Sequence, residues 1–156
     1  MARTRGGRTR RIGLISDTHG LLRPEALEYL AGSDHIIHAG DIGDPAILEA
    51  LRAIAPVTAV RGNNDRGPWA KRLRDTEVLQ VGEARICVVH DVHDFAGADC
   101  QVVVSGHSHK PKVERRDGIL YVNPGSSGPR RFSLPVAAGE VRISGSSVRA
   151  RIKELL

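Results

Sequence analysis

Aromatic and sulfur-containing side chains are scarce in this 156-residue sequence. Aromatic residues make up 3% of it: two Phe, two Tyr and one Trp. So few rings offer no evident platform for stacking bases, and we expect no sequence-specific binding of nucleic acid. The two cysteines, Cys87 and Cys100, form no CxxC pair, which argues against a zinc site built on paired thiolates. We interpret both as lone buried thiols in a reducing compartment.

Long apolar runs are also missing. No run approaches the roughly 20 residues that a membrane-spanning helix needs. The basic start MARTRGGRTRR is followed only by the short IGLIS before Asp17, so the apolar stretch and cleavage site of a secretory signal are absent. We therefore expect a cytoplasmic protein that does not contact a membrane.

Acidic residues are absent from the first eleven positions, where five arginines lie: Arg3, Arg5, Arg8, Arg10 and Arg11. The whole chain has a formal net charge of +5, so the remaining residues are neutral in sum. We interpret residues 1–10 as a basic tail, which could meet RNA or an acidic partner but is more often simply solvated. Residues 11–156 are predicted to form a single domain, because this length suits one core.

Apolar segments alternate with helical patterns in the first half of the chain. Strands are expected at 11–16, 35–40 and 57–60, and helices at 24–32 and 44–55. This order predicts a parallel β-α-β-α-β start. The second half reads instead as antiparallel strand pairs, at 77–90, 112–123 and 137–155, which turn at GE, at DG and near GSS. Two sheets packed face to face, with helices outside at least the first, are the predicted architecture.

Polar residues cluster where the predicted strands end. The clusters are ISDTHG, HAGD, RGNND, VVHD and SGHSH. In open α/β sheets the ligand crevice lies outside the carboxyl ends of the strands, so we expect these segments to converge at one rim. If the chain stays extended there, Asp17 and His19 point the same way, as do His107 and His109.

The convergent side chains are of the types that bind transition metals. They comprise two carboxylates, one amide and four imidazoles: Asp17, Asp41, Asn63, His19, His90, His107 and His109. A set of nitrogen and oxygen donors without thiolate suits Mn²⁺, Fe or Zn²⁺ better than Ca²⁺ or a structural zinc. Seven ligands exceed the need of one ion, whereas two ions that share a carboxylate would each receive four. The sequence therefore predicts a two-metal hydrolytic site, with Mn²⁺ preferred and Fe, Zn, Ni or Co as alternatives.

Each motif alone has a plainer interpretation. A DTH or GD segment is usually a surface turn or a helix cap, and a lone histidine after a strand is more often structural than a ligand. We interpret His35 and His38 as structural, while His93 follows His90 closely enough to line a pocket. The order and repeated placement of the motifs favour the metal site over these readings.

Taken together, the motifs resemble those of the calcineurin-like metallophosphoesterase superfamily, and within it the small prokaryotic phosphodiesterase branch. DTHG, HAGD, GNND, the strand-end histidine, GHSHK and NPGSSGPRR occur in the family's order between Ile12 and about Arg131. The resemblance implies a four-layer α/β/β/α sandwich with two mixed sheets. It implies two metals with Asp41 as the bridging ligand. Metal one would be held by Asp17, His19, Asp41 and His109, and metal two by Asp41, Asn63, His90 and His107.

Two positions depart from the family pattern. Asn64 stands where many relatives carry a histidine that protonates the leaving oxygen, and an amide is no useful acid near pH 7. Asn64, and with less support Arg66, are expected to contact the substrate, and Asp65 is the nearest candidate to orient a histidine introduced at position 64. Asp91 replaces the usual glycine after His90, where it could orient His90 or offset the positive charge of the site.

The predicted function is hydrolysis of a phosphate ester, most readily a diester, by a hydroxide that bridges the two metals. A phosphomonoesterase or a nuclease could use the same site. A metal-binding scaffold for protein interactions is the competing class, although none of the seven ligands is lost. The resemblance implies a dimer or larger assembly, whereas a monomer of this length could also bury an adequate core. The natural substrate is not predicted.

Overall fold

The first half of the chain forms the predicted parallel unit. The computed structural model describes residues 8–156. The unit consists of β1 (Arg10–Ile15), α1 (Pro24–Leu30), β2 (His35–His38), α2 (Pro45–Arg52) and β3 (Val57–Ala59). β1 pairs in parallel with β2, and β2 in parallel with β3. Each strand and helix lies within four residues of its predicted bounds, so the apolar pattern located this half of the fold.

The second half forms the three predicted hairpins. They are β4 (Thr76–Val81) with β5 (Ala84–Val89), β7 (Lys112–Arg116) with β8 (Ile119–Asn123), and β9 (Ala137–Ser144) with β10 (Ser147–Glu154). Three short elements complete the chain: α3 (Pro68–Lys71), the 3-10 turn η2 (Val92–Asp94) and β6 (Val102–Val104). Of these, α3 and η2 were not predicted.

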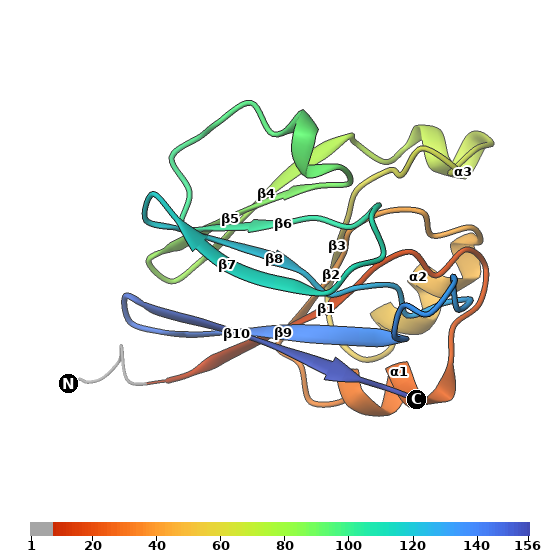
Figure 1. Ribbon diagram of the computed structural model, residues 1–156, viewed down its shortest axis with the longest axis horizontal. Coiled ribbons are helices and arrows are strands. Elements are labelled where there is room, and N and C mark those ends of the chain that lie inside the picture. The colour runs from red at the N-terminus through yellow and green to blue at the C-terminus, as the bar shows by residue number, and fades with distance from the viewer. Residues whose placement is uncertain (1–7) are drawn as a thin grey trace.

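The hairpins divide between two stacked five-stranded sheets (Figure 1). The first sheet has the order β10-β9-β1-β2-β3, and the second has the order β4-β5-β6-β8-β7. β9 lies antiparallel beside β1, so the C-terminal hairpin completes the sheet with which the chain begins. Both sheets contain parallel and antiparallel pairs, which confirms the predicted sandwich of two mixed sheets.

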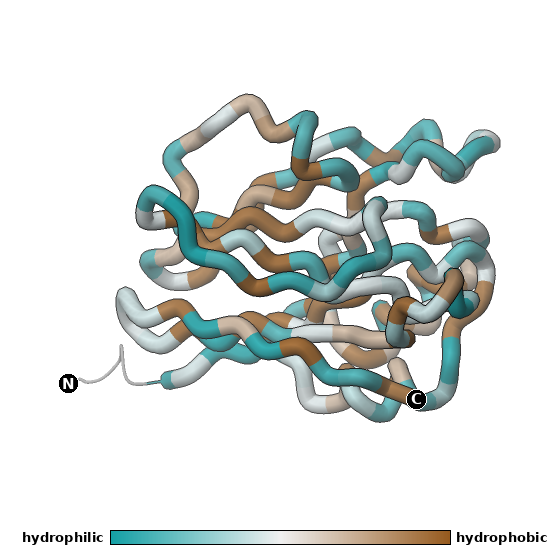
Figure 2. Tube along the Cα trace, viewed as in Figure 1, coloured by the Kyte–Doolittle hydropathy of each residue, from teal (hydrophilic) through white to brown (hydrophobic). Residues whose placement is uncertain are grey.

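The main core lies between the two sheets. Ile12 and Leu14 of β1 face it from the first sheet, and Val102 and Val104 of β6 face it from the second. Val103 points to the opposite side of β6 and is also buried. β6 is thus covered on both faces, which explains why it reads as three consecutive valines. Figure 2 shows these hydrophobic stretches along the strands, with hydrophilic residues in many of the connecting loops.

The outer faces of the two sheets are covered differently. α1 and α2 pack on the first sheet through residues such as Leu30 and Leu51. On the second sheet a smaller cluster that includes Cys87 and Cys100 lies under Phe95, in the loop that follows η2, and the described residues place no α-helix there.

The two thiols are free and buried, as predicted, but they are neighbours rather than isolated. Burial and the Cys87 thiol raise the pKa of Cys100 to about 12, so Cys100 is a poor nucleophile at neutral pH.

The first strand, β1, begins at Arg10. The first seven residues of the predicted basic tail lie outside the described part of the chain. Arg8 forms an exposed ion pair with Asp34 at 3.2 Å. Arg11, one of the five N-terminal arginines, is part of β1 and is half-buried against Glu140 of β9 at 2.7 Å. Within residues 8–156, no helix is both long and apolar enough to span a bilayer.

Candidate metal centre

The segments that follow the strands converge at one rim of the sandwich, as their positions in the sequence predict. Asp17 and His19 follow β1, Asp41 follows β2, and Asn63 follows β3. The second sheet contributes residues after β5 and β6: His90, His107 and His109. Backbone hydrogen bonds join these segments, from Asp17 N to Gly40 O (3.0 Å) and from Gly106 N to His90 O (2.9 Å). His90 Nδ1 donates to Ala39 O at 2.7 Å and joins the second sheet to the first, so the rim is one connected structure formed by both sheets.

Most of the candidate ligands occupy a strained backbone conformation. Five of the seven have a positive φ between 47° and 69°: Asp17, His19, Asp41, His107 and His109. This left-handed region is uncommon for residues other than glycine, and such strain gathers at functional sites where the surroundings enforce it. The premise of an extended chain at these pairs is wrong. The ring of His109 stacks on that of His19, with centroids 5.4 Å apart, whereas His107 packs edge-on against His90 at 5.2 Å.

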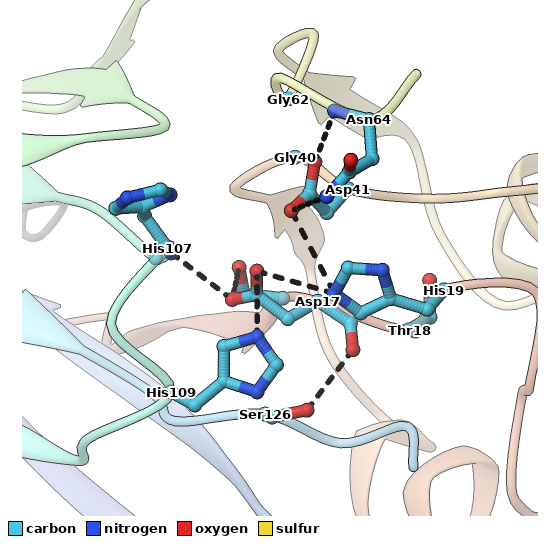
Figure 3. A network of polar contacts seen from close by, with 12 residues as sticks. Asp17, Thr18, His19, Gly40, Asp41, Gly62, Asn64, His107, His109 and Ser126 are labelled. Carbon is cyan, nitrogen blue, oxygen red and sulfur yellow. Dashed lines mark hydrogen bonds and ion pairs between the residues drawn. The ribbon is translucent and has the colours of Figure 1, made fainter. Parts of the chain in front are cut away.

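Asp17, His19 and His109 form one group of atoms that could hold an ion. Asp17 Oδ1 lies 3.9 Å from His19 Nε2 and 3.6 Å from His109 Nε2 (Figure 3). Asp17 Oδ1 and His19 Nε2 are buried and have no hydrogen-bond partner among the described residues. A buried polar atom without a partner is costly, so the geometry fits a cation bound between these side chains.

The other polar atoms of Asp17 are held by the protein. Its Oδ2 accepts hydrogen bonds from Ser16 Oγ at 2.7 Å and from His107 N at 3.2 Å. Its backbone oxygen accepts from Ser126 Oγ at 3.0 Å. Burial raises the pKa of Asp17, against the opposing effect of Ser16, because a carboxylate in a dry environment is disfavoured. A cation at Oδ1 would favour the charged form.

Asp41 lies between histidines of the two sheets. Its Oδ2 is 3.6 Å from His19 Nε2 and 3.3 Å from His90 Nε2. Asn64 contacts both oxygens: its backbone N–H donates to Oδ1 at 2.9 Å, and its side-chain amide donates to Oδ2 at 3.1 Å. Burial opposes the ionised form, but His90 and Asn64 outweigh it and hold the pKa of Asp41 well below its usual value.

His90 is fixed by three neighbours. Its Nδ1 donates to the backbone oxygen of Ala39 at 2.7 Å, and its Nε2 lies 3.0 Å from Asn63 Oδ1. Burial disfavours the charged ring, yet Asp41 and Ala39 outweigh this effect and raise the pKa of His90 to about 9. A second group that could hold an ion consists of Asp17, Asp41 and His90. In this structure Asp17 is common to both groups, whereas the family resemblance makes Asp41 the shared ligand.

The remaining predicted residues divide into those at the site and those away from it. Asn64 lies directly on Asp41, as described above. Arg66 is exposed, and among the described residues it forms no hydrogen bond or ion pair with the candidate ligands. Asp91 does not orient His90, because the ring contacts Ala39, Asn63 and Asp41 instead. The role suggested for Asp91 on His90 is therefore wrong.

The histidines outside the ligand set behave as the sequence suggests. Gly40 N donates to Nδ1 of His38 at 3.1 Å, so the ring proton lies on Nε2 and faces Thr18 Oγ1 at 3.0 Å. Burial lowers the pKa of His38 to about 3, so this ring is neutral and structural. His35 Nε2 contacts Thr58 Oγ1 at 2.8 Å, also away from the site. His93 is exposed and lines a groove beside His107.

Sequence reasoning missed the small residues that let the segments approach one another. A Cβ at Gly62 would lie 2.1 Å from Asp41 N, and one at Gly106 would lie 2.1 Å from Ser16 Oγ. Glycine at these positions allows the segments after β3 and β6 to pack on Asp41 and Ser16. The signal was present in the quoted motifs GNND and GHSHK, each of which begins with such a glycine.

A cavity of about 660 Å³ opens beside the histidines of the second sheet. Its wall includes Asn63, His90, Asp91 and His107, with Arg61 and Asp75 farther along. The cavity thus adjoins the candidate ligands and is large enough for a small-molecule ligand.

Comparisons with known proteins assign the chain to a family. The family model of the calcineurin-like phosphoesterase superfamily domain matches residues 11–144. A probable metallophosphoesterase of Methanocaldococcus jannaschii is 35% identical over 145 residues, which cover 82% of this chain and 73% of that protein. A phosphodiesterase of the same organism is 25% identical over 137 residues, covering 74% of this chain and 82% of that protein.

The fold has a solved counterpart in vacuolar protein sorting 29 of Cryptosporidium parvum. The two superpose with a TM-score of 0.76 at 21% identity, over 94% of this chain and 97% of that one. The chain belongs to the calcineurin-like phosphoesterase superfamily. Membership of this family supports the activity of a metal-dependent phosphoesterase. The described residues include groups of side chains that could hold divalent ions.

Proposed function

We propose that the protein is a phosphodiesterase with two divalent metal ions, Mn²⁺ in preference to Fe, Zn, Ni or Co. The observation that carries this proposal is the pair of buried, unpartnered atoms Asp17 Oδ1 and His19 Nε2, which face each other at 3.9 Å. Two ions at this centre would polarise the phosphoryl oxygens and supply a hydroxide nucleophile near neutral pH. The phosphodiesterase of Methanocaldococcus jannaschii, at 25% identity, supports the choice of a diester.

The seven predicted ligands would divide between the two ions. Asp17, His19 and His109 would hold the first, and Asn63, His90 and His107 would hold the second. Asp41 would contact both, which its position between His19 and His90 supports. The edge-on packing of His107 against His90, away from His109, supports the assignment of the two histidines of GHSHK to different ions.

The chain's own residues would hold and orient the substrate. Asn64 lies on Asp41 with an amide that can donate a hydrogen bond to a phosphoryl oxygen. The cavity beside His90 and His107 would accept one ester arm of a diester.

We also propose a cytoplasmic location. For the assembly we propose a dimer or larger form.

The test combines metal analysis with two chromogenic substrates. Protein reconstituted with Mn²⁺ is expected to bind close to two ions per chain and to hydrolyse bis-p-nitrophenyl phosphate faster than p-nitrophenyl phosphate. Asp17→Asn should lose metal and turnover together, because it removes the charge that compensates the first ion. The matched control is Asp117→Asn in the turn between β7 and β8, where Asn suits the positive φ of 53°.

Each alternative gives a different result in this experiment. Saturation at one ion per chain would overturn the two-metal centre. Faster turnover of the monoester would indicate a phosphomonoesterase on the same site. Two bound ions without turnover of either substrate would favour the scaffold.

A further inference from the structure

One carboxylate oxygen of Asp91 is hydrogen-bonded within a local turn, and the other points toward the candidate centre. It caps η2: Oδ1 accepts a hydrogen bond from His93 N at 3.1 Å and lies 3.0 Å from His93 Nδ1. These two contacts fix the orientation of the carboxylate. The other oxygen, Oδ2, faces Nε2 of His107 at 3.8 Å.

Unlike the ring of His90, the ring of His107 has no hydrogen-bond partner among the described residues. The second nitrogen of His90 donates to the backbone oxygen of Ala39. Among the described residues, no hydrogen bond reaches either ring nitrogen of His107, and the nearest carboxylate to its Nε2 is that of Asp91. The His107 side chain is 46% exposed, so its ring has room to move toward Asp91.

A neutral imidazole bears a single proton, and the group that accepts this proton decides which nitrogen is left to bind a metal. Metal-binding histidines commonly donate their second N–H to a carboxylate or a carbonyl, which fixes the ring and makes it a stronger ligand. His90 has a carbonyl in this position. Asp91 is the group placed to do the same for His107.

We propose that Asp91 is a positioning residue for His107: its Oδ2 accepts the Nε2–H of the ring and thereby leaves Nδ1 of His107 to bind the second metal. This inference rests on the proposed two-metal function. Asp91 and His107 line both the cavity of about 660 Å³ and the groove that contains His93, so the Asp91 carboxylate would add negative charge next to the second ion. Asp91 does not touch the substrate and acts through the histidine.

The experiment compares three variants by metal affinity rather than by activity alone. Asp91→Ala removes the acceptor, whereas Asp91→Asn keeps an acceptor oxygen and a side chain able to cap η2. Asp94→Asn is the matched control, because Asp94 lines the same cavity and, among the described residues, forms no hydrogen bond or ion pair with His107. The dissociation constants of both Mn²⁺ equivalents are measured by competition with a chelator.

Asp91→Ala is expected to weaken one of the two equivalents by about 10- to 100-fold and to leave the other unchanged. Asp91→Asn should fall between wild type and Asp91→Ala, and Asp94→Asn should match wild type. In ¹⁵N NMR spectra of the Zn²⁺-loaded wild type, the ring proton of His107 should lie on Nε2. The same spectra are recorded for Asp91→Asn to determine the tautomer of His107. Its side chain can still cap η2, so the loop should stay folded.

The outcomes separate this inference from the proposed function. Two equivalents in wild type with affinities that Asp91→Ala leaves unchanged would overturn the role of Asp91 alone. A His107 ring protonated on Nδ1 in the loaded protein would do the same. A single equivalent in wild type would overturn the two-metal proposal, and this inference with it.

Discussion

At the scale of the residue, the two carboxylates of the centre are held in different ways. Asp17 has one oxygen bonded to Ser16 and one without a partner, whereas Asp41 contacts Asn64 through both oxygens and faces histidines on two sides. A substitution at Asp41 therefore alters the surroundings of more than one candidate ligand. A substitution at a single histidine would alter the ligands of only one of the two proposed ions.

We expect Asp41→Asn to reduce kcat/KM more than His19→Ala, by a further factor of about ten, or about 1.4 kcal/mol of transition-state stabilisation. Asn retains the shape of Asp but removes a negative charge that both ions would share. The measurement is turnover of bis-p-nitrophenyl phosphate, with metal content determined for each variant. Equal losses in the two variants would contradict a bridging role for Asp41.

The introduction of a proton donor at position 64 tests what Asn64 faces. In Asn64→His, kcat/KM for alkyl diesters should rise relative to that for nitrophenyl diesters, because an alkoxide needs a proton to leave. The gain should stay well below the usual 10²–10⁴ of general acid catalysis. Asp65 is buried and each of its oxygens already accepts a hydrogen bond, from Gly43 N and Gly62 N at 2.9 Å, so it is poorly placed to orient the new ring.

The readout is the dependence of kcat/KM on the pKa of the leaving group, in wild type and in Asn64→His, with both metals bound. Asn64→Gln serves as the control for a longer side chain without an acid. An unchanged dependence in the histidine variant would mean that residue 64 does not face the leaving oxygen.

At the scale of the element, an ion-pair network centred on the buried Glu140 joins the first strand to the C-terminal hairpin. Glu140 of β9 is 4% exposed and accepts hydrogen bonds from Arg11 at 2.7 Å and Arg142 at 2.6 Å. Arg11 also donates to the backbone oxygens of Tyr29 and Ala31, at the end of α1. The network thus joins β1, β9 and α1 on the outer face of the first sheet.

Glu140→Gln should lower the free energy of unfolding by about 2 kcal/mol at pH 7, the usual contribution of a hydrogen bond to a charged partner. Burial opposes the ionised form, but Arg142 and Arg11 outweigh it and hold the pKa of Glu140 below its usual value. The stabilisation is therefore complete above the unfolded pKa, near 4.3, and is lost as the pH falls through the lower folded pKa.

Urea unfolding between pH 3 and pH 7 measures this effect. The difference in stability between wild type and Glu140→Gln should shrink below about pH 4. Glu83→Gln, in the exposed turn between β4 and β5, is the control and should stay within about 0.5 kcal/mol of wild type. A difference that does not change with pH would contradict the proposed role of the charge.

At the scale of the whole molecule, positive charge is not confined to the N-terminal tail. The outer side of the β9-β10 hairpin bears exposed cations at alternating positions: Arg142, Arg149, Arg151 and Lys153. Arg149 lies directly opposite Arg142 in the register of the hairpin. The formal neutrality of residues 12–156 therefore includes a group of exposed cations on this hairpin, of which Arg142 is paired with Glu140.

Removal of residues 1–7 should leave kcat/KM for bis-p-nitrophenyl phosphate unchanged, because no candidate ligand precedes Asp17. A chain that starts at Arg11 is a less suitable test, since β1 begins at Arg10 and Arg8 pairs with Asp34. Turnover and the midpoint of thermal unfolding are measured for both truncations. A large fall in turnover for the shorter deletion would show that the tail takes part in the reaction.

The sequence alone predicted the strands and the two longer helices, though not α3 or η2, and it led to the candidate ligand set, which stays a prediction. Apolar patterns of period 2 and 3.6 reflect which face of a strand or helix is buried, so they located β1 to β3 and the three hairpins. The residue types after each strand indicated a transition-metal site. Both depend on information that is local in the chain or on the rule that parallel strands share a carboxyl edge.

The tertiary structure alone decided which atoms face each other. The return of β9 to β1, the division of His107 and His109 between two neighbours, and the turn of Asp91 toward His107 depend on contacts between distant segments. Left-handed backbone at the ligands made the extended-chain argument fail, because such conformations are enforced by surrounding contacts rather than by local preference. A pattern of residue types determines what a rim can bind, and the packing of both sheets determines where each atom lies.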